Sequence, residues 1–212
     1  MAATPVRRRS RKSAERLDTI IESATREIIE HGFDNLSVAS IAGAAGLSVG
    51  GIYRYITTKA DLLVMVCKNI YDGVREQLGE IVTGEGPIEQ RLEDAIDFYL
   101  RACESKRAQV AMVYREYRNL PEDAQTFFMQ REQAIADVFA DLVRAGVKSG
   151  AFRPVDPTVL SFDIVFLGHL PSFKRWALGG VVTSDELRRE HIALIMSRVA
   201  RADEQSALPD DV

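Results

Sequence analysis

Apolar residues recur along the chain at intervals of three and four positions, which is the spacing of an amphipathic helix. The first segment with this pattern ends at Gly32. Its apolar positions are Leu17, Ile20, Ile21, Ala24, Ile28 and Ile29. No segment alternates apolar and polar residues in the way that marks a half-buried strand. The pattern therefore predicts an all-α protein.

Shorter helices follow, and each begins at a residue type that caps helices. Ser37 is suited to cap a helix that ends before Gly46, and Ser48 to cap the next one. Thr58, with Asp61 three residues later, marks the start of a long fourth helix. We therefore expect four helices in the first eighty residues.

The sequence TGEGP, at residues 83–87, is the clearest break in the pattern. Asp156 with Pro157, and the sequence TSDE at residues 183–186, are typical helix starts. The helices expected beyond the break cover residues 88–104, 107–119, 122–148, 157–178 and 184–201. The final sequence, ADEQSALPDDV, has the composition of a disordered acidic tail.

Charge is distributed unevenly along the 212 residues, whose net charge is −4. Residues 1–60 hold nine Lys and Arg against six Asp and Glu, a balance of +3 that leaves −7 for the rest. This asymmetry is typical of a basic nucleic-acid-binding head on an acidic body. The N-terminal basic run is either an arm that contacts DNA or a solubilising tail. It consists of Arg7, Arg8, Arg9, Arg11 and Lys12.

Several other classes of protein are disfavoured by composition. No apolar run reaches the roughly 18 residues that a membrane helix needs, and no apolar segment follows the basic N-terminus as in a signal peptide. We therefore expect a cytoplasmic protein that does not enter a membrane. Cys67 and Cys103 lack the spacing of a zinc site and are expected to be buried, reduced thiols, with no metal and no cofactor.

Three residues have the spacing of a helix-turn-helix. Such a motif needs a small residue where the helices cross, a glycine in the turn and an apolar residue that packs the second helix back. Ala42, Gly46 and Ile52 meet these needs in order. The second helix would then protrude with its N-terminal residues outward, as helices that enter the DNA major groove do. An ordinary helical hairpin is the alternative.

The surrounding sequence, FDNLSVASIAGAAGLSVGGIYRYITTKADLL, resembles the DNA-binding domain of the TetR family of transcriptional regulators over about residues 14–65. The matching positions are Gly32-Phe33, Ser37, Ile41-Ala42, Ala45 to Ser48, Ile52 to Ile56, Lys59 and Leu62-Leu63. Leu47, Ile52 and Ile56 depart mildly from the usual Val, Leu and Phe. The resemblance implies a three-helix helix-turn-helix head, joined by a long helix to a helical bundle that binds a ligand and dimerises.

On this basis we expect four regions in the chain. They are a basic N-terminal arm at 1–13, a DNA-binding domain at 14–60, a helical ligand-binding and dimerisation domain at 61–201 and a disordered tail at 202–212. The resemblance implies a repressor that a small hydrophobic ligand releases from a palindromic operator. It also implies a homodimer formed through the last two helices, since two heads about one DNA turn apart read a palindrome.

Phosphate contacts are assigned by the resemblance to Tyr53, Tyr55 and Lys59, whose hydroxyls and ammonium can donate to phosphate oxygens. Ser37 and Ser48 lie at helix starts, where backbone N–H groups attract anions.

Base-edge contacts would fall to small residues near the helix starts, whose methyl groups can meet thymine and whose glycines permit close approach. These residues are Val38, Ala39, Val49, Gly50 and Gly51. Arg54 can reach either a base or the backbone.

A ligand cavity in the body is likewise implied by the resemblance, since aromatic stripes at helical spacing are usually core. The candidate lining residues are Phe98, Met112, Tyr117, Phe128, Phe166, His169, Phe173 and Trp176. His169 lies between Gly168 and Pro171, where a kinked helix would open space for a ligand, although a satisfied core histidine is the alternative. The sequences REYRNLPED and FKRWALGG loosely resemble regulators that sense acyl-CoA thioesters, whose phosphates Arg and Lys would bind.

Two other functions fit the sequence less well than a regulator does. An enzyme is disfavoured because the sequence contains no GxSxG, HExxH, P-loop or GxGxxG motif. An architectural DNA-binding protein that takes no ligand would leave the large acidic body without a purpose. A ligand-responsive regulator is therefore the preferred interpretation.

Overall fold

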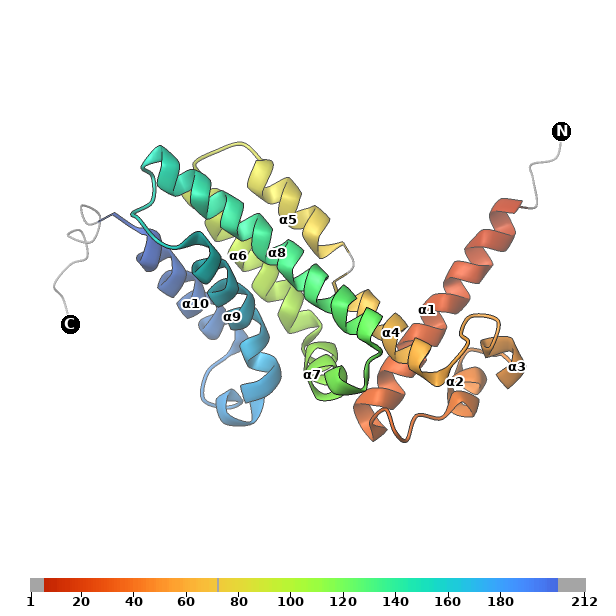
Figure 1. Cartoon of the computed structure of the whole chain (residues 1–212). Helices are drawn as coiled ribbons and strands as arrows, with labels where there is room; N and C mark the ends of the chain where they lie inside the picture. Colours follow the sequence, from red (N-terminus) through yellow and green to blue (C-terminus); the bar gives the residue numbers. More distant parts are fainter. Residues whose placement is uncertain (1–5, 72, 202–212) are drawn as a thin grey trace. The chain divides into compact units, whose positions relative to one another are not determined.

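The computed structural model describes residues 6–71 and 73–201 (Figure 1). These residues form ten α-helices and one short 3-10 helix, and no strand lies among them, so the all-α prediction is confirmed. The helices are α1 (Val6–His31), α2 (Val38–Ala44), α3 (Val49–Ile52), α4 (Lys59–Ile70), α5 (Val74–Thr83), α6 (Ile88–Ser105), α7 (Arg107–Glu116), η1 (Tyr117–Asn119), α8 (Glu122–Ser149), α9 (Pro157–Leu178) and α10 (Ser184–Val199).

Two helices near the N-terminus differ from the prediction. α1 begins at Val6, so residues 6–13 of the predicted arm continue the helix, because residues 6–31 contain many good helix formers and no Gly or Pro. The predicted long fourth helix ends at Ile70, and a separate helix, α5, follows. Gly73 has a φ of 72°, a left-handed conformation that ends the helical path there. Residues 1–5 of the arm and the tail at 202–212 lie outside the described residues.

The chain divides into two compact units. Among the described residues, the first contains those up to Ile70 together with Ala111–Phe128. The second contains those within Tyr71–Val110 and residues 129–201. This division differs from the predicted boundary at residue 60, because α4 belongs to the first unit. One boundary follows Ile70, and the other two fall inside α7 and α8.

The first unit is built around α1, which packs against α2 and α4, while α2 packs against α3. α2 has seven residues and α3 has four, too few for a helix to be stable in water by itself. Their stability therefore comes from packing. The fully buried side chains that supply it include Ile20, Ala24, Ile28, Ile41, Ile52, Leu62 and Leu63.

The second unit centres on α6, which packs against α5, α9 and α10. The aromatic rings of Tyr99 on α6 and Phe139 on α8 meet edge to face, with centroids 5.6 Å apart. On α9, a Cβ added at Gly168 would lie 2.6 Å from Cε1 of Tyr99. The expectation that Gly168 opens space for a ligand is therefore wrong, because Tyr99 fills that space.

Local signals at the start of the last two helices acted as predicted. The Asp156 carboxylate accepts hydrogen bonds from the backbone N–H groups of Thr158 and Val159, at 2.9 and 3.0 Å. Thr183 and Glu186 form the complete capping box that opens α10. α9 continues as a helix through Pro171. No helix within the described ranges is long and apolar enough to cross a membrane.

Candidate functional site

The turn between α2 and α3 is held by two backbone hydrogen bonds around Gly46, whose φ is 62°. The N–H of Leu47 donates to the carbonyl of Ala42 at 2.8 Å, and the N–H of Gly46 donates to the carbonyl of Gly43 at 3.1 Å. This pair of bonds is the Schellman motif, which ends a helix with a left-handed residue. This conformation agrees with the role predicted for Gly46 just past the end of the helix, since a side chain would strain it.

Serine side chains cap both helices of the motif, as the sequence predicts. The Ser37 hydroxyl accepts from the N–H of Ser40 at 3.2 Å, and the Ser48 hydroxyl accepts from the N–H of Gly51 at 3.1 Å. The other backbone N–H groups of each first turn have no helical partner and remain donors for an anion. The two helix starts can therefore bind phosphate oxygens.

The short helix α3 has one buried and one exposed face. Ile52 is fully buried and anchors the helix in the first unit, while Val49 is 42% and Tyr53 50% exposed. Gly50 is exposed, and a Cβ there would meet no atom within 4 Å. Gly51 is buried, and its Cβ would lie 3.4 Å from Cβ of Leu47. Gly51 therefore differs from the prediction that both glycines face DNA, because a side chain at Gly51 would point toward Leu47 and Ser48 at the start of α3.

The other residues assigned to DNA contact lie mostly at the surface. Ser37, Ala39, Ser48 and Arg54 are exposed, and Val38, Tyr55 and Lys59 are half-buried. The surface formed by these residues with Val49, Gly50 and Tyr53 is called the recognition surface below. It offers hydroxyl, ammonium and guanidinium donors around a small apolar patch, which suits phosphate binding combined with methyl contacts.

Lys59 already has partners inside the first unit. Its Nζ donates to the backbone carbonyl of Asp34 at 2.7 Å and lies 5.1 Å from the ring centroid of Phe33. An ammonium has three donors, so two remain for a phosphate. Lys59 thus ties the start of α4 to the turn that leads into α2. Sequence reasoning did not predict this second role.

His169, on α9, lies in a buried polar cluster within the second unit. Its Nε2 is 3.0 Å from the hydroxyl of Tyr99 and 3.4 Å from that of Tyr71, and its Nδ1 is 3.9 Å from a carboxylate oxygen of Glu132. Burial lowers the pKa of His169 to about 4, so the ring is neutral near pH 7. Sequence reasoning missed Tyr71 and Glu132, because they reach His169 from distant parts of the chain.

The remaining candidate ligand residues are divided between the two units. Met112, Tyr117 and Phe128 belong to the first unit, and the other four belong to the second. Within the second unit, Phe98 and Phe173 are half-buried, Phe166 is 56% exposed and Trp176 is 80% exposed. A ligand role for these residues stays a prediction.

Arg115 already has hydrogen-bond partners, and the two cysteines are buried. Arg115, in the sequence assigned to coenzyme binding, donates to the carbonyl of Ile28 and to the Glu116 carboxylate, whose charge would repel a phosphate. The role predicted for Arg115 is therefore disfavoured. Cys67 and Cys103 are free and buried, which agrees with the prediction of buried thiols. Burial raises the pKa of both thiols to about 12, so they are protonated near pH 7.

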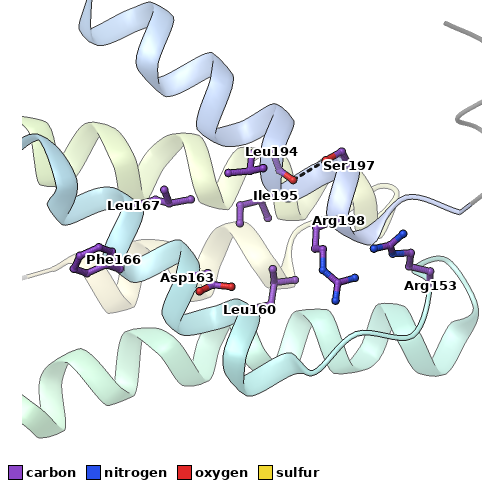
Figure 2. Close-up of a pocket in the computed structure, with 9 residues that line it drawn as sticks. All are labelled: Arg153, Leu160, Asp163, Phe166, Leu167, Leu194, Ile195, Ser197 and Arg198. Carbon is purple, nitrogen blue, oxygen red and sulfur yellow. Dashed lines mark hydrogen bonds between the residues drawn. The ribbon is translucent and has the colours of Figure 1, made fainter. Parts of the chain in front are cut away.

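A hollow of about 520 Å³ lies between α9 and α10 (Figure 2). Apolar side chains from both helices line it, and two arginines and an aspartate lie beside them. Its lining residues are Arg153, Leu160, Asp163, Phe166, Leu167, Leu194, Ile195, Ser197 and Arg198. On α9 the exposed side chains of Val159, Phe162 and Phe166 follow the same helix face, at intervals of three and four residues.

Comparison with known families gives two matches that together cover most of the chain. Residues 20–66 match the family described as bacterial regulatory proteins, tetR family. Residues 85–199 match the tetracyclin repressor-like, C-terminal domain. The first match contains α2, α3 and the start of α4, and the second runs from α6 to α10.

Individual relatives and structures agree with these matches. The chain is 26% identical over 194 residues to the HTH-type transcriptional regulator HbdR of Aromatoleum sp. (strain CIB). The aligned residues cover 92% of this chain and 85% of HbdR. It is 22% identical over 191 residues to the HTH-type transcriptional repressor KstR2 of Mycolicibacterium smegmatis, covering 89% and 93% of the two chains. The crystal structure of AibR in complex with isovaleryl coenzyme A and operator DNA shares the fold, with a TM-score of 0.70, 23% identity, and coverage of 84% of this chain and 97% of AibR.

Proposed function

The chain belongs to the TetR family of bacterial regulatory proteins, and we propose that it is a repressor that a small hydrophobic ligand releases from a palindromic operator. It is a DNA-binding transcriptional regulator. The observation that carries the proposal is the outward face of α3, where Val49, Gly50 and Tyr53 are exposed while Ile52 is fully buried. A helix that is packed on one face and exposed on the other can enter the major groove without rearranging.

The proposal includes a homodimer formed through α9 and α10. Val159, Phe162 and Phe166 expose an apolar stripe on α9, and Leu194 on α10 is 57% exposed. Such a stripe on a soluble chain typically packs against a partner. The hollow beside it carries both Asp163 and arginines, so a second copy related by a two-fold axis would meet groups of opposite charge. Four helices, two from each copy, would then form the interface.

The proposed ligand is a hydrophobic metabolite, and an acyl-CoA thioester is the first class to test. AibR is described in complex with isovaleryl coenzyme A, and its fold is similar to that of this chain. The second unit offers half-buried aromatic side chains at Phe98 on α6 and Phe173 on α9, the helices that also carry Tyr99 and His169. Ligand binding shifts the population between DNA-competent and incompetent states only if the ligand prefers one of them.

A release assay tests the proposal. A labelled duplex, selected from a random pool by the full-length protein, would be titrated with isovaleryl coenzyme A, coenzyme A alone and other thioesters while fluorescence anisotropy is followed. Release by a thioester but not by coenzyme A supports a ligand-responsive repressor. DNA binding that is indifferent to every metabolite, including those that mass spectrometry finds in the purified protein, would favour the architectural alternative. The proposal includes a cytoplasmic location and no catalytic activity.

A further inference from the structure

The end of α7 belongs to the same compact unit as the DNA-binding helices. The unit boundary falls between Val110 and Ala111, inside α7, so that helix contains residues of both units. The residues that follow, through η1 to the start of α8, also belong to the first unit. The family roles of the helix-turn-helix do not account for these residues.

Two adjacent side chains at the end of α7 bind the last turn of α1 and Phe33, two residues beyond its end. The Nη2 of Arg115 donates to the carbonyl of Ile28 at 2.6 Å. One carboxylate oxygen of Glu116 accepts from Nε of Arg115 at 2.8 Å and lies 3.5 Å from the backbone nitrogen of Phe33, which donates to it. The other oxygen accepts from the amide of Asn119 at 2.9 Å.

These contacts are favourable for both charges. Ile28 lies in the last turn of α1, where the helix dipole attracts a cation such as Arg115. The carbonyl of Ile28 accepts from the N–H of Gly32 at 2.9 Å as well as from Arg115. Glu116 is only 5% exposed. Burial alone would raise its pKa, but the hydrogen bonds from Asn119, Arg115 and Phe33 outweigh that effect and hold the pKa below its usual range. The carboxylate is therefore ionised and satisfied near pH 7.

The segment that Glu116 holds leads directly to the recognition surface. It is the turn Gly32–Leu36, and Ser37 follows it as the cap of α2. Lys59 at the start of α4 holds the same turn through the carbonyl of Asp34. The turn is thus fixed by side chains from α4 and from α7, and its position decides where α2 begins.

We propose that Arg115 and Glu116 are positioning residues for DNA recognition, which fix the turn Gly32–Leu36 and make the recognition surface sensitive to the position of α7. They contact no DNA themselves. The inference rests on the proposed DNA-binding role of the recognition surface. It also gives a path for regulation, because a shift of α7 along its axis would move Arg115 and Glu116, and these side chains hold Ile28 and Phe33.

The test uses the full-length protein and a duplex that the wild-type protein selects from a random pool. The variants are Arg115→Met, Arg115→Lys, Glu116→Gln and the double variant Arg115→Met with Glu116→Gln. Asp141→Asn is the matched control, because it breaks an exposed pair with Arg144 on α8 in the other unit. Anisotropy gives the affinity for the selected and a scrambled duplex, and hydrogen exchange reports on residues 28–36.

We expect Arg115→Met and Glu116→Gln each to weaken binding of the selected duplex by about 5- to 10-fold. Binding of the scrambled duplex should change less, because phosphate donors are retained. Exchange should rise over residues 28–36. The double variant should be little worse than the poorer single variant, since both residues act in one network. Arg115→Lys should be intermediate, because a lysine lacks the fork that reaches two acceptors at once.

Wild-type affinity for the selected duplex in the folded single variants would overturn the inference. So would an affinity loss without faster exchange at residues 28–36, or an equal loss in Asp141→Asn. Arg115 is half exposed, so its variants should fold even if Glu116→Gln does not, and they test the inference alone. A wild-type protein that selects no duplex would instead refute the proposed DNA recognition.

Discussion

Gly50 and Gly51 give a matched pair of substitutions that separates stability from DNA binding. A Cβ at Gly50 would meet nothing within 4 Å, so Gly50→Ala should fit without strain. Alanine in place of glycine inside a helix stabilises by roughly 0.5–1 kcal/mol. Because α3 has only four residues, the lower value is the better expectation. A gain of about 0.5 kcal/mol corresponds to a rise in Tm of about 1–2 °C for a chain of this length.

The same methyl group should weaken DNA binding. Gly50 lies on the exposed face of α3, where the proposed approach to base edges leaves no room for an added carbon. We expect a loss comparable to one mismatched base pair, about 1–3 kcal/mol. Gly51→Ala is the control, because Gly51 is buried and its Cβ would make a tight but ordinary contact with Leu47. That variant should bind the duplex almost as the wild type does.

Differential scanning fluorimetry and anisotropy on a selected duplex measure the two effects in the same protein samples. A Gly50→Ala variant that binds as tightly as the wild type would show that α3 does not approach DNA at this residue. A larger loss of affinity in Gly51→Ala than in Gly50→Ala, at unchanged Tm, would show that the exposed and buried faces of α3 are assigned the wrong way round.

Three further predictions follow from the described contacts. Lys59→Met should weaken binding to any duplex, because it removes one phosphate contact. Anisotropy measured between low and high salt should show that the slope of the log binding constant against log salt concentration becomes smaller in magnitude by about 0.9. An unchanged slope would contradict a phosphate contact. Gly168→Ala should destabilise by about 1–3 kcal/mol in urea unfolding, because its Cβ would overlap Tyr99, while Gly79→Ala, in open space, should not. Burial lowers the pKa of His169 from 6.5 to about 4, so the unfolded state binds a proton at a higher pH than the folded state does. The free energy of unfolding should therefore fall as the pH falls from 6.5 toward 4, by up to about 1.4 kcal/mol per pH unit. This pH dependence should be weaker in His169→Gln.

Features that depend on neighbouring residues could be predicted from the sequence. The caps at Ser37, Ser48 and Thr183 and the left-handed Gly46 use partners within a few residues, so the local pattern contains all the information. The break at Gly73 was missed because a single glycine within a helical pattern is often tolerated, and periodicity continues on both sides of it.

Features that depend on distant residues could not be predicted in this way. Glu116 binds the N–H of Phe33 across 83 residues, and His169 lies near Tyr71 across 98 residues. Neither pair has a spacing rule that one sequence can reveal. The packing of Tyr99 against Gly168 is similar, since a glycine between helices can indicate either open space or close approach, and only the neighbouring helix decides which.

DNA and α7 act on the same short turn, and this has a consequence that can be measured from either side. Lys59 holds the turn through Asp34 and is expected to bind a phosphate, while Glu116 holds it through Phe33. Coupling between two sites is reciprocal, so if α7 positions the recognition surface, bound DNA must also stabilise the end of α7. Hydrogen exchange over residues 111–119 should therefore slow when the selected duplex binds, although the recognition surface includes none of these residues. The slowing should be absent in Glu116→Gln at saturating duplex, and equal slowing in that variant would show that the coupling takes another path.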